Sequence, residues 1–419
     1  MQIIVFEDDQ LSRLHPITIG RPGYAISCAS YRLIDWLARL SDETGAPLRG
    51  VVRPHLAQIQ ELDFPQIDRR RPTIETPALL VNSRLVPSVA AYHSLKKLVN
   101  GLETAAIYCD GALAAAMIGP RGPAPPPNGE VEHWLKYLAN SLVGMLPETA
   151  AKLPLFTYPH DVVRHHLEII GESLAHRLEG GRFQEIADGV FAAEGATIGE
   201  YVVTDTSKGP VLLDEGAAVG PHCFLRGPAY LGPKARVIEH SAIKDAVALG
   251  HTTKIGGEIE ASIVEPYTNK QHHGFLGHSY LGSWINLGAG TSNSDLKNTY
   301  GTVKMEYRGE SVATGMQFVG CILGDYAKSA INTGIFTGKT VGCCSMLYGF
   351  VTTNVPSFVN YARLFGQVTE LPAEVMIATQ QRMFARRNVQ QRPCDIALIH
   401  AMYDLTRPER QLAGEPLAL

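Results

Sequence analysis

A six-residue repeat of aliphatic side chains constrains the fold of this chain more than any other feature of its sequence. Counting every sixth residue from Leu213 to Ile255 gives eight aliphatic residues without a miss. Hydrophobic residues of all types make up 45% of the chain, so a given starting point would produce such a run only about twice in a thousand trials. The period fits neither a 3.6-residue helix nor a simple alternating strand. It is typical of a parallel β-helix, in which short strands separated by turns each point one side chain inward.

The repeat has two interruptions. Its phase resumes at Leu281 and Leu287, and once more between Leu323 and Leu347. Residues 257–280 and 289–322 break it. Because the stacked coils of a β-helix leave no room for extra residues, we expect both segments to leave the coil as loops that carry binding groups.

The segments around the repeat indicate three domains. Residues 1–185 alternate short apolar runs with helical patterns, which predicts an α/β Rossmann-like domain. Residues 186–355 form the β-helix, and residues 356–419 form a helical extension that we expect to cap it. The expected strands are 3–6, 78–81 and 104–109, and the expected helices are 31–40, 130–146, 161–178, 372–388 and 394–407.

Charge and cysteine content exclude several classes of protein. Lys and Arg number 37 against 41 Asp and Glu, so no global field attracts nucleic acid. No apolar run approaches the ~20 residues of a membrane span, and the first ten residues carry acids where a signal peptide is basic. The seven cysteines are scattered without a C-x-x-C pair, which indicates buried thiols in a reducing compartment. We therefore expect a cytoplasmic protein that binds neither membrane nor nucleic acid.

The densest polar stretch straddles the first interruption and contains an extended motif. The run H-x-x-x-L-G-x-x-x-[IL]-G-x-x-x-N-[IL]-G-A-G-T is met from His272 to Thr291. It resembles the acetyltransferase half of the bifunctional bacterial enzymes that make UDP-N-acetylglucosamine. It resembles more closely their divergent relatives, the sugar nucleotidyltransferases with a C-terminal left-handed β-helix. Segments 81–87 and 158–163 are also similar to these relatives, so the resemblance covers nearly the whole chain.

The resemblance implies a fold and a reaction. The fold would be a nucleotidyltransferase-like domain followed by a left-handed β-helix that forms homotrimers, with active sites between protomers. The reaction would be transfer of an acetyl group from acetyl-CoA to a sugar phosphate or nucleotide sugar. Such a transfer needs a base for the amine proton, and an imidazole with an ordinary pKa near 6.5 suits this task. His272 matches the catalytic histidine of the family.

The resemblance also implies substrate and cofactor contacts. Ala289 would present its backbone amide to the thioester carbonyl, with Gly290 and Thr291 beside it. Glu260 stands where the bifunctional enzymes have a lysine for the sugar phosphate, and a carboxylate there repels phosphate. We therefore expect a changed acceptor, unless Lys297, Lys270 or Arg226 supplies the positive charge. The substrate-binding candidates are Arg226, Glu260, Lys270, Phe275, Asn286 and Asp295.

The N-terminal domain departs from the family at its phosphate-binding loop. A sugar nucleotidyltransferase normally has a glycine-rich loop after its first strand, because backbone amides must cradle a triphosphate. Residues 5–16 contain no glycine. Nucleotide-binding candidates are instead Arg13, Arg21, Asn82 and Arg84, and Asp161 is a candidate Mg²⁺ ligand.

Two other classes of function remain open. β-Helices also host carbonic anhydrases whose zinc is held by three histidines, and His273 and His278 have the five-residue spacing of two of them. The third ligand would be His240 or His251, since Val237 occupies the expected position. The other alternative is a trimeric scaffold or sugar-nucleotide sensor without catalysis. In the C-terminal extension, Arg382, Arg386 and Arg387 share a helical face that is either solvated or positioned to meet a nucleotide phosphate.

Overall fold

The structure of the protein, a computed structural model, describes residues 1–68, 77–122, 146–149 and 151–412. It contains two compact units, each with its own core. The helix expected at 130–146 lies outside the described residues apart from its last position, and the sequence-based boundaries at 185 and 355 stay predictions. The N-terminal unit comprises residues 1–14, 21–26 and 31–157, and the C-terminal unit comprises residues 15–20, 27–30 and 158–419.

A five-stranded sheet in the order β4-β1-β5-β7-β6 lies at the centre of the N-terminal unit. β1 is parallel to β4 and β5, whereas β7 is antiparallel to β5 and β6. The three strands expected here are confirmed. Strand β7 was not expected, because its alanine-rich sequence has a low strand propensity. The strands of this sheet are β1 (Gln2–Phe6), β4 (Leu48–Val51), β5 (Ala78–Asn82), β6 (Ala105–Cys109) and β7 (Ala112–Ile118), and the short β3 (Tyr31–Arg32) lies outside it.

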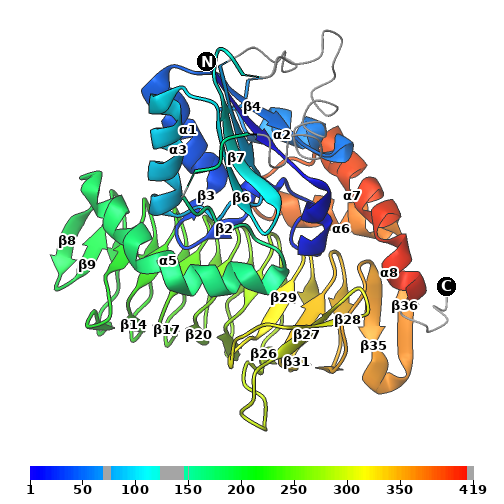
Figure 1. The fold of residues 1–419 in the computed structure, drawn as a ribbon. Coiled ribbons are helices and arrows are strands. Elements are labelled where there is room, and N and C mark those ends of the chain that lie inside the picture. Colours follow the sequence, from blue (N-terminus) through cyan, green and yellow to red (C-terminus); the bar gives the residue numbers. More distant parts are fainter. Residues whose placement is uncertain (69–76, 123–145, 150, 413–419) are drawn as a thin grey trace. The chain divides into compact units, whose positions relative to one another are not determined.

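Helices cover this sheet on the face formed by Ile3, Val5, Leu79 and Val81. Helices α1 (Leu33–Thr44) and α3 (Val89–Gly101) lie side by side there (Figure 1). Their apolar side chains join those strands in one core. The helix expected at 31–40 is thus confirmed as α1. Helix α2 (Ala57–Asp63) is also part of this unit.

The C-terminal unit is a parallel β-helix with three faces. Apart from the antiparallel end strands β8 and β36, the strands pair in parallel with those of the neighbouring coils, which confirms the architecture predicted from the repeat. Face one consists of β8 (Gln184–Ala187), β9 (Val190–Ala192), β12 (Val211–Leu213), β15 (Ala229–Leu231), β18 (Val247–Leu249), β21 (Ile263–Val264), β24 (Tyr280–Leu281), β29 (Cys321–Leu323) and β32 (Lys339–Val341).

The other two faces are built in the same way. Face two consists of β10 (Thr197–Ile198), β13 (Ala218–Val219), β16 (Arg236–Val237), β19 (Lys254–Ile255), β22 (Asn269–Lys270), β25 (Asn286–Leu287), β30 (Lys328–Ser329), β33 (Met346–Leu347), β35 (Val359–Ala362) and the antiparallel β36 (Gln367–Glu370). Face three consists of β11 (Val203–Asp205), β14 (Phe224–Arg226), β17 (Ala242–Lys244), β20 (Glu258–Glu260) and β23 (Phe275–Gly277), followed by β26 (Ser292–Asn293), β31 (Gly334–Ile335) and β34 (Phe350–Val351).

The aliphatic repeat fills the interior of the β-helix. Leu213, Leu231 and Leu249 follow one another in face one and are buried. Corresponding residues from the other two faces join them in a single core. Each additional coil buries apolar surface of its neighbours, and this burial stabilises the β-helix by ~25 cal/mol for every Å² removed from water.

The expectation that residues 257–280 leave the coil is wrong. They form β20 to β24 and pair in register with the coils on both sides. The repeat slips because the turns are tight, with Gly257 (φ +79°) and Ala261 (φ +49°) in the left-handed region. Two turns are therefore shorter than in the regular coil, and the inward position moves from Ile255 to Ile259 and then Val264.

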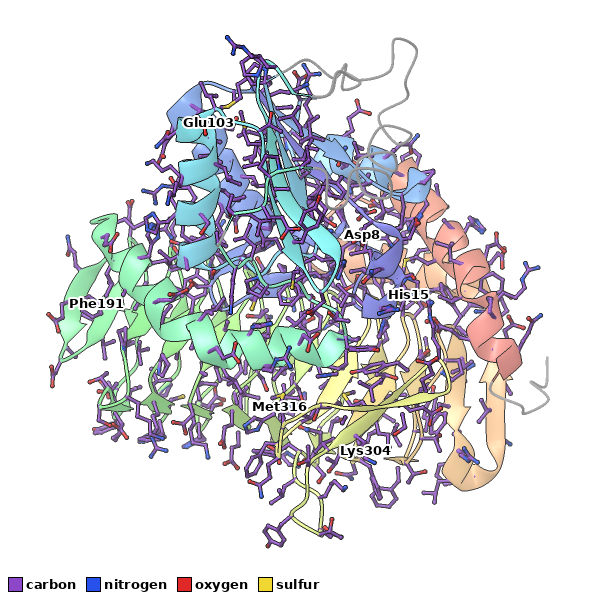
Figure 2. The ribbon with its side chains drawn as sticks, in the orientation of Figure 1. Asp8, His15, Glu103, Phe191, Lys304 and Met316 are labelled. Carbon is purple, nitrogen blue, oxygen red and sulfur yellow. The ribbon has the colours of Figure 1, made fainter. Side chains whose placement is uncertain are left out.

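The second interruption leaves the coil only in part: residues 292–293 form β26 of face three, and the chain leaves the coil between β26 and β29. It contains the hairpin of β27 (Lys304–Tyr307) and β28 (Glu310–Ala313), and Figure 2 labels Lys304 and Met316 there. Tyr307 ties this excursion to the start of α5 (Pro159–Glu179): its hydroxyl lies 2.9 Å from Nδ1 of His160 and its ring stacks on Tyr158.

Helix α5 runs along face one of the β-helix (Figure 1). Its Ile170 and Leu174 pack on Leu212 and Tyr230, which point outward from that face. His166 is fully buried between the helix and the coil. The amide of Ala29 donates to its Nδ1 at 2.9 Å, and its Nε2 donates to the carbonyl oxygen of Ala246 at 2.8 Å. Burial lowers the pKa of His166 to about 4.

We expect His166 to make the protein acid-sensitive. The unfolded state binds a proton on this imidazole below about pH 6.5, whereas the native state resists protonation down to about pH 4. Stability should therefore fall as the pH drops through this window, by about 3 kcal/mol at 1.4 kcal/mol per pKa unit. Urea unfolding from pH 7 to pH 4 measures the loss, which should largely disappear in His166→Asn. The neighbouring substitution His165→Gln should retain it, and equal slopes for wild type and His166→Asn would contradict the assignment.

The C-terminal helices are confirmed as α6 (Ala373–Ala385) and α7 (Pro393–Leu405), followed by α8 (Arg407–Leu412). Helix α6 packs along one corner of the β-helix, where Phe384 contacts Trp284 and Gln380 donates to the hydroxyl of Tyr326. The short strand β2 (Ser27–Cys28) also belongs to this unit. Among the described residues, none of the helices is both long and apolar enough to span a bilayer.

Candidate functional site

The corner between faces two and three at residues 271–274, here called the histidine corner, carries the histidine singled out in the sequence. It connects β22 to β23 and leaves His272 and His273 exposed. Nε2 of His272 lies 3.3 Å from the side-chain nitrogen of Gln271. Because an amide NH₂ group only donates, a neutral imidazole accepts this bond at Nε2 when its proton is on Nδ1. An exposed neutral imidazole can accept a proton from a bound reactant.

Lys270 lies inside the β-helix, directly before the histidine corner. It occupies the inward position of face two beside Ile255, and only 2% of its surface is exposed. Its Nζ donates to the carbonyl oxygens of Gly256 and His272, both at 2.9 Å. Burial lowers the pKa of Lys270 to about 8. Its predicted contact with substrate gains no support from this position, which instead fixes the backbone of His272.

Residues 288–291, here called the alanine corner, stack on the histidine corner in the next coil. The amide of Gly290 donates to the carbonyl oxygen of His273 at 3.0 Å. Gly274 has a φ of +127°, and a Cβ at this position would overlap the carbonyl oxygen of Thr291. Only glycine permits both this conformation and this approach. The fold therefore brings the histidine and the A-G-T part of the motif together.

Three of the four amides in the alanine corner have acceptors, and that of Gly288 donates to the carbonyl oxygen of Ser329 at 3.1 Å. Gly290 donates to His273, and Thr291 donates to the carbonyl oxygen of Gly288 at 3.1 Å. The amide of Ala289 has no acceptor among the described residues. It is thus the amide of this corner that is open to a ligand oxygen, and its predicted contact with the thioester carbonyl stays a prediction.

Asn286 lies on the outer side of face two, beside both corners. It is exposed, and its Oδ1 accepts a hydrogen bond of 2.7 Å from Asn269 in the preceding coil. Its amide nitrogen remains on the surface next to the alanine corner. This position is compatible with a contact to a sugar substrate, which stays a prediction.

Glu260 is paired with a lysine that the sequence reasoning overlooked. Nζ of Lys244 lies 2.5 Å from Oε1 of Glu258 and 3.5 Å from Oε2 of Glu260. Lys244 is the residue opposite Glu260 in the preceding coil of face three. A search of the sequence for the residue one coil before Glu260 would have found Lys244. The two carboxylates share one cation, so this part of face three keeps a negative charge.

The other cations proposed to compensate Glu260 are engaged elsewhere. Arg226 lies 2.9 Å from Oδ2 of Asp205 and 3.3 Å from Oδ2 of Asp245. Nζ of Lys297 donates to the carbonyl oxygen of Thr302 at 3.2 Å. The contacts of Arg226 and Lys297 therefore do not place a positive charge next to Glu260. Their predicted contacts with substrate stay untested.

His278 and Asp295 form an ion-pair geometry that the sequence did not reveal. Nδ1 of His278 lies 2.8 Å from Oδ2 of Asp295, and each side chain is about 15% exposed. The ring of Phe318 stacks on the imidazole at 5.1 Å. A Cβ at Gly277 would overlap both Asp295 and the ring of Phe275, so these residues lie together. A carboxylate at Nδ1 orients the ring and leaves Nε2 as an acceptor, which makes His278 a second candidate base.

The predicted metal sites gain no support. Asp161 accepts a hydrogen bond from the amide of Tyr158 at 2.8 Å and lies 2.7 Å from Nη2 of Arg164. It therefore stabilises the start of α5 and does not fit a Mg²⁺ site. Across the described part of the chain, no group of three or more His, Cys, Asp or Glu side chains is arranged to hold a metal ion. The zinc hypothesis built on His273 and His278 thus lacks a ligand set.

In the N-terminal unit, two nucleotide-binding candidates are committed to an internal network. Arg84 is 1% exposed and makes two contacts with Asp8, at 2.8 Å and 2.6 Å, while its Nη1 donates to the carbonyl oxygen of Phe156. Asn82 donates to Asp8 at 2.9 Å. Asp8 directly follows β1 (Figure 2), at the carboxyl edge of the parallel strands where ligands of such sheets bind.

A second ion pair lies close by. Glu7 is paired with Arg53 at 2.9 Å and accepts the amide of Gly23 at 3.0 Å. The carbonyl oxygen of Arg21 accepts a hydrogen bond from Arg53, and the Arg21 side chain is largely buried. Arg13 is exposed in the 3₁₀ helix of residues 9–14. Glu7 and Asp8 thus neutralise Arg53 and Arg84 at this edge.

Comparison with known proteins finds one family model and several curated relatives that are similar to part of the chain. Residues 3–181 match a family model described as sugar nucleotidyl transferase. The bifunctional sugar-1-phosphate nucleotidylyltransferase/acetyltransferase of Sulfurisphaera tokodaii is 26% identical over 149 residues, which cover 35% of this chain and 37% of that protein. The bifunctional protein GlmU of Methanocaldococcus jannaschii is 30% identical over 141 residues, 32% of this chain and 33% of that protein.

The extent of these matches is limited. The chain spans about a third of the length of these curated relatives. Among solved structures, the UDP-N-acetylglucosamine acyltransferase of Francisella novicida is 16% identical with a TM-score of 0.37, covering 56% of this chain and 79% of that protein. The β-helix is therefore assigned from its own strand pairing.

Proposed function

From the match of residues 3–181 to the sugar nucleotidyl transferase family, and from the likeness to bifunctional nucleotidyl- and acetyltransferases, we propose that this protein is a transferase of nucleotide-sugar metabolism. Its β-helix transfers an acetyl group from acetyl-CoA to the amino group of a sugar phosphate or nucleotide sugar. His272 is the general base of this reaction.

One observation carries the proposal: the stacking of the histidine corner on the alanine corner. The hydrogen bond from Gly290 to His273 fixes the two corners one coil apart, about 4.8 Å. The amide of Ala289, which has no acceptor in the described chain, is thereby held close to an exposed imidazole. Acyl transfer to an amine requires both a base and a backbone donor within reach of the same thioester group.

The roles of the residues follow from the bonds that change. The amine nitrogen attacks the thioester carbon, a C–N bond forms, and the C–S bond breaks to release the thiol of coenzyme A. A ring nitrogen of His272 takes the proton that the amine loses and returns it to the departing sulfur. The amide of Ala289 donates to the carbonyl oxygen as negative charge develops there. Lys270, fixed inside the coil, holds the carbonyl group of His272 and so positions the base.

The negative charge around Glu260 predicts a preference among acceptors. Two carboxylates share Lys244 there, so a phosphate dianion is repelled, whereas hydroxyl or ammonium groups of an acceptor are attracted. We expect weak turnover of glucosamine 1-phosphate by the wild type and at least a tenfold gain in kcat/KM in Glu260→Lys, measured as thiol release from acetyl-CoA.

A charge-neutral control for this experiment is Glu260→Gln, which should give a smaller gain than the lysine. Strong wild-type activity on glucosamine 1-phosphate that neither substitution improves would show that Glu260 does not face the acceptor. If acetyl-CoA neither binds nor turns over with any amino sugar, the non-catalytic scaffold becomes the better interpretation.

The proposal includes a homotrimer formed through the β-helix and assigns no nucleotidyl transfer to the N-terminal unit. Large apolar side chains such as Ile331, Phe336 and Phe350 are exposed at the end of the β-helix, and a neighbouring protomer would cover them. Nucleotidyl transfer is left out because Arg84 is neutralised by Asp8. The hydratase alternative has no metal ligand set among the described residues.

A further inference from the structure

A cluster of four cations lies on the β-helix away from the two corners described above. Arg236 and Lys254 are opposite one another in neighbouring coils of face two, on the outward side of the strands. Arg386 and Arg387 follow the end of α6. The stacking of Phe384 on Trp284, with ring centroids 4.4 Å apart, fixes this end of the helix beside face two. These four residues are here called the basic cluster.

No carboxylate of the described residues pairs with the basic cluster. None of its four residues has an ion pair among the described parts of the chain, in contrast to Arg226 and Lys244 on face three. Burial, and then the positive charges of the other members, lower the pKa of Lys254 and of Arg387. Like charges held this close repel one another. A folded protein retains such an arrangement at a cost in stability that a bound anion removes.

Aromatic side chains border the basic cluster. Tyr267 and Trp284 occupy the same corner of successive coils and stack with centroids 4.1 Å apart. His251 meets the edge of Tyr267 in the coil before. The helix end with Arg386 and Arg387 adjoins this stack through Phe384. Cations next to a partly exposed aromatic stack suit a ligand that joins phosphate groups to a flat ring.

The position of the cluster also relates it to the histidine corner. Lys254 is opposite Asn269 in the next coil, and Asn269 precedes His272 by three residues. One coil spacing and three residues of strand correspond to about 11 Å between Cα atoms. A nucleotide-linked molecule anchored by its phosphates at the cluster is long enough to reach His272.

We propose that Arg236, Lys254, Arg386 and Arg387 bind the diphosphate group of a ligand that carries a nucleoside diphosphate ester. The negatively charged oxygens of a diphosphate ester are attracted to this excess of positive charge, and arginine binds phosphate oxygens through paired hydrogen bonds. Two sources share this chemistry, namely a nucleotide sugar and coenzyme A. The inference does not rest on acyl transfer, because binding at the cluster is measured without turnover.

The test is binding to the full-length protein by calorimetry, with three probes: UDP-N-acetylglucosamine, coenzyme A and inorganic pyrophosphate. The double variant Lys254→Met/Arg387→Met should lose at least tenfold in affinity for each probe that the wild type binds. The matched control is Arg382→Met on the same helix, whose side chain is exposed and bonds to Thr379. It should bind like the wild type.

Thermal unfolding of the same proteins guards against a misfolded variant. Without ligand the double variant should melt at the same temperature as the wild type or higher, because charge repulsion is relieved. With ligand its melting temperature should no longer rise. Binding of the nucleotide sugar alone, or of coenzyme A alone, identifies the source. Failure of all three probes to bind the wild type, or equal binding by the double variant, overturns the proposal.

Discussion

Replacing His272 by alanine should lower kcat for acetyl transfer by about 10²- to 10⁴-fold and leave the affinity for acetyl-CoA nearly unchanged. A general base acts on the amine proton only as the transition state forms, so its loss appears in kcat and not in ground-state binding. The side chain is exposed, and its recorded side-chain contact is with Gln271, so the substitution should not weaken the fold. Initial rates of thiol release and calorimetric binding of acetyl-CoA measure the two effects separately.

Two other histidines provide the controls for this experiment. His273→Ala removes the neighbour in the same corner and should cost much less. His278→Ala removes the imidazole paired with Asp295, and it tests the rival base directly. If His278→Ala abolishes turnover and His272→Ala does not, the base belongs to the pair on face three and the assignment of His272 is wrong.

The pH dependence of turnover adds an independent check on Lys270. Lys270 lies beneath His272 and positions its backbone. Lys270→Met should therefore change both the value of kcat and its dependence on pH. Loss of the two hydrogen bonds to backbone carbonyl groups would move the histidine corner. An unchanged profile with lower stability would indicate a purely structural lysine.

Replacing Arg84 by methionine should destabilise the N-terminal unit by about 3–5 kcal/mol. The guanidinium is buried, and it bonds to both carboxylate oxygens of Asp8 and to the carbonyl oxygen of Phe156. Removing one partner of a buried ion pair leaves the other charge without compensation, which is the costly case. Chemical unfolding followed by circular dichroism measures the loss.

The matched substitution Arg13→Met should change stability little, because Arg13 is exposed. The double variant Asp8→Asn/Arg84→Met should recover part of the loss, since it removes both charges. If Arg84 binds a nucleotide instead, Arg84→Met would keep wild-type stability and lose a thermal shift with nucleoside triphosphates. That outcome would restore Arg84 as a ligand-binding residue.

The architecture of the C-terminal unit could be predicted from the amino-acid sequence alone. The aliphatic repeat from Leu213 to Ile255 is a local property. Each six-residue segment forms one face of a coil and must point one apolar side chain into the interior, whatever the sequence of the neighbouring coils. The strands β1, β5 and β6 and the helices α1 and α5 are similarly local. The motif from His272 to Thr291 also located both corners of the candidate site.

Which side chains of different coils contact one another could be seen only in the tertiary structure. A coil contains a variable number of residues because its turns are shortened, as at Gly257 and Ala261, so the partner one coil away is not fixed by a constant spacing. This is why Lys244 was missed beside Glu260, and why His278 and Asp295 were considered separately. Lys270 illustrates the same limit: two short turns bring a lysine to an inward position.

The partners of the buried polar groups far from the repeat could not be predicted from the sequence either. Arg84 and Asp8 lie 76 residues apart in sequence, and His166 lies 137 residues from Ala29. Their partners depend on which strands are neighbours and on how α5 packs against face one, and no local pattern encodes that. Sequence periodicity specifies which side of a strand faces the core, whereas the pairing of charges across coils and strands is set only when those elements are in register.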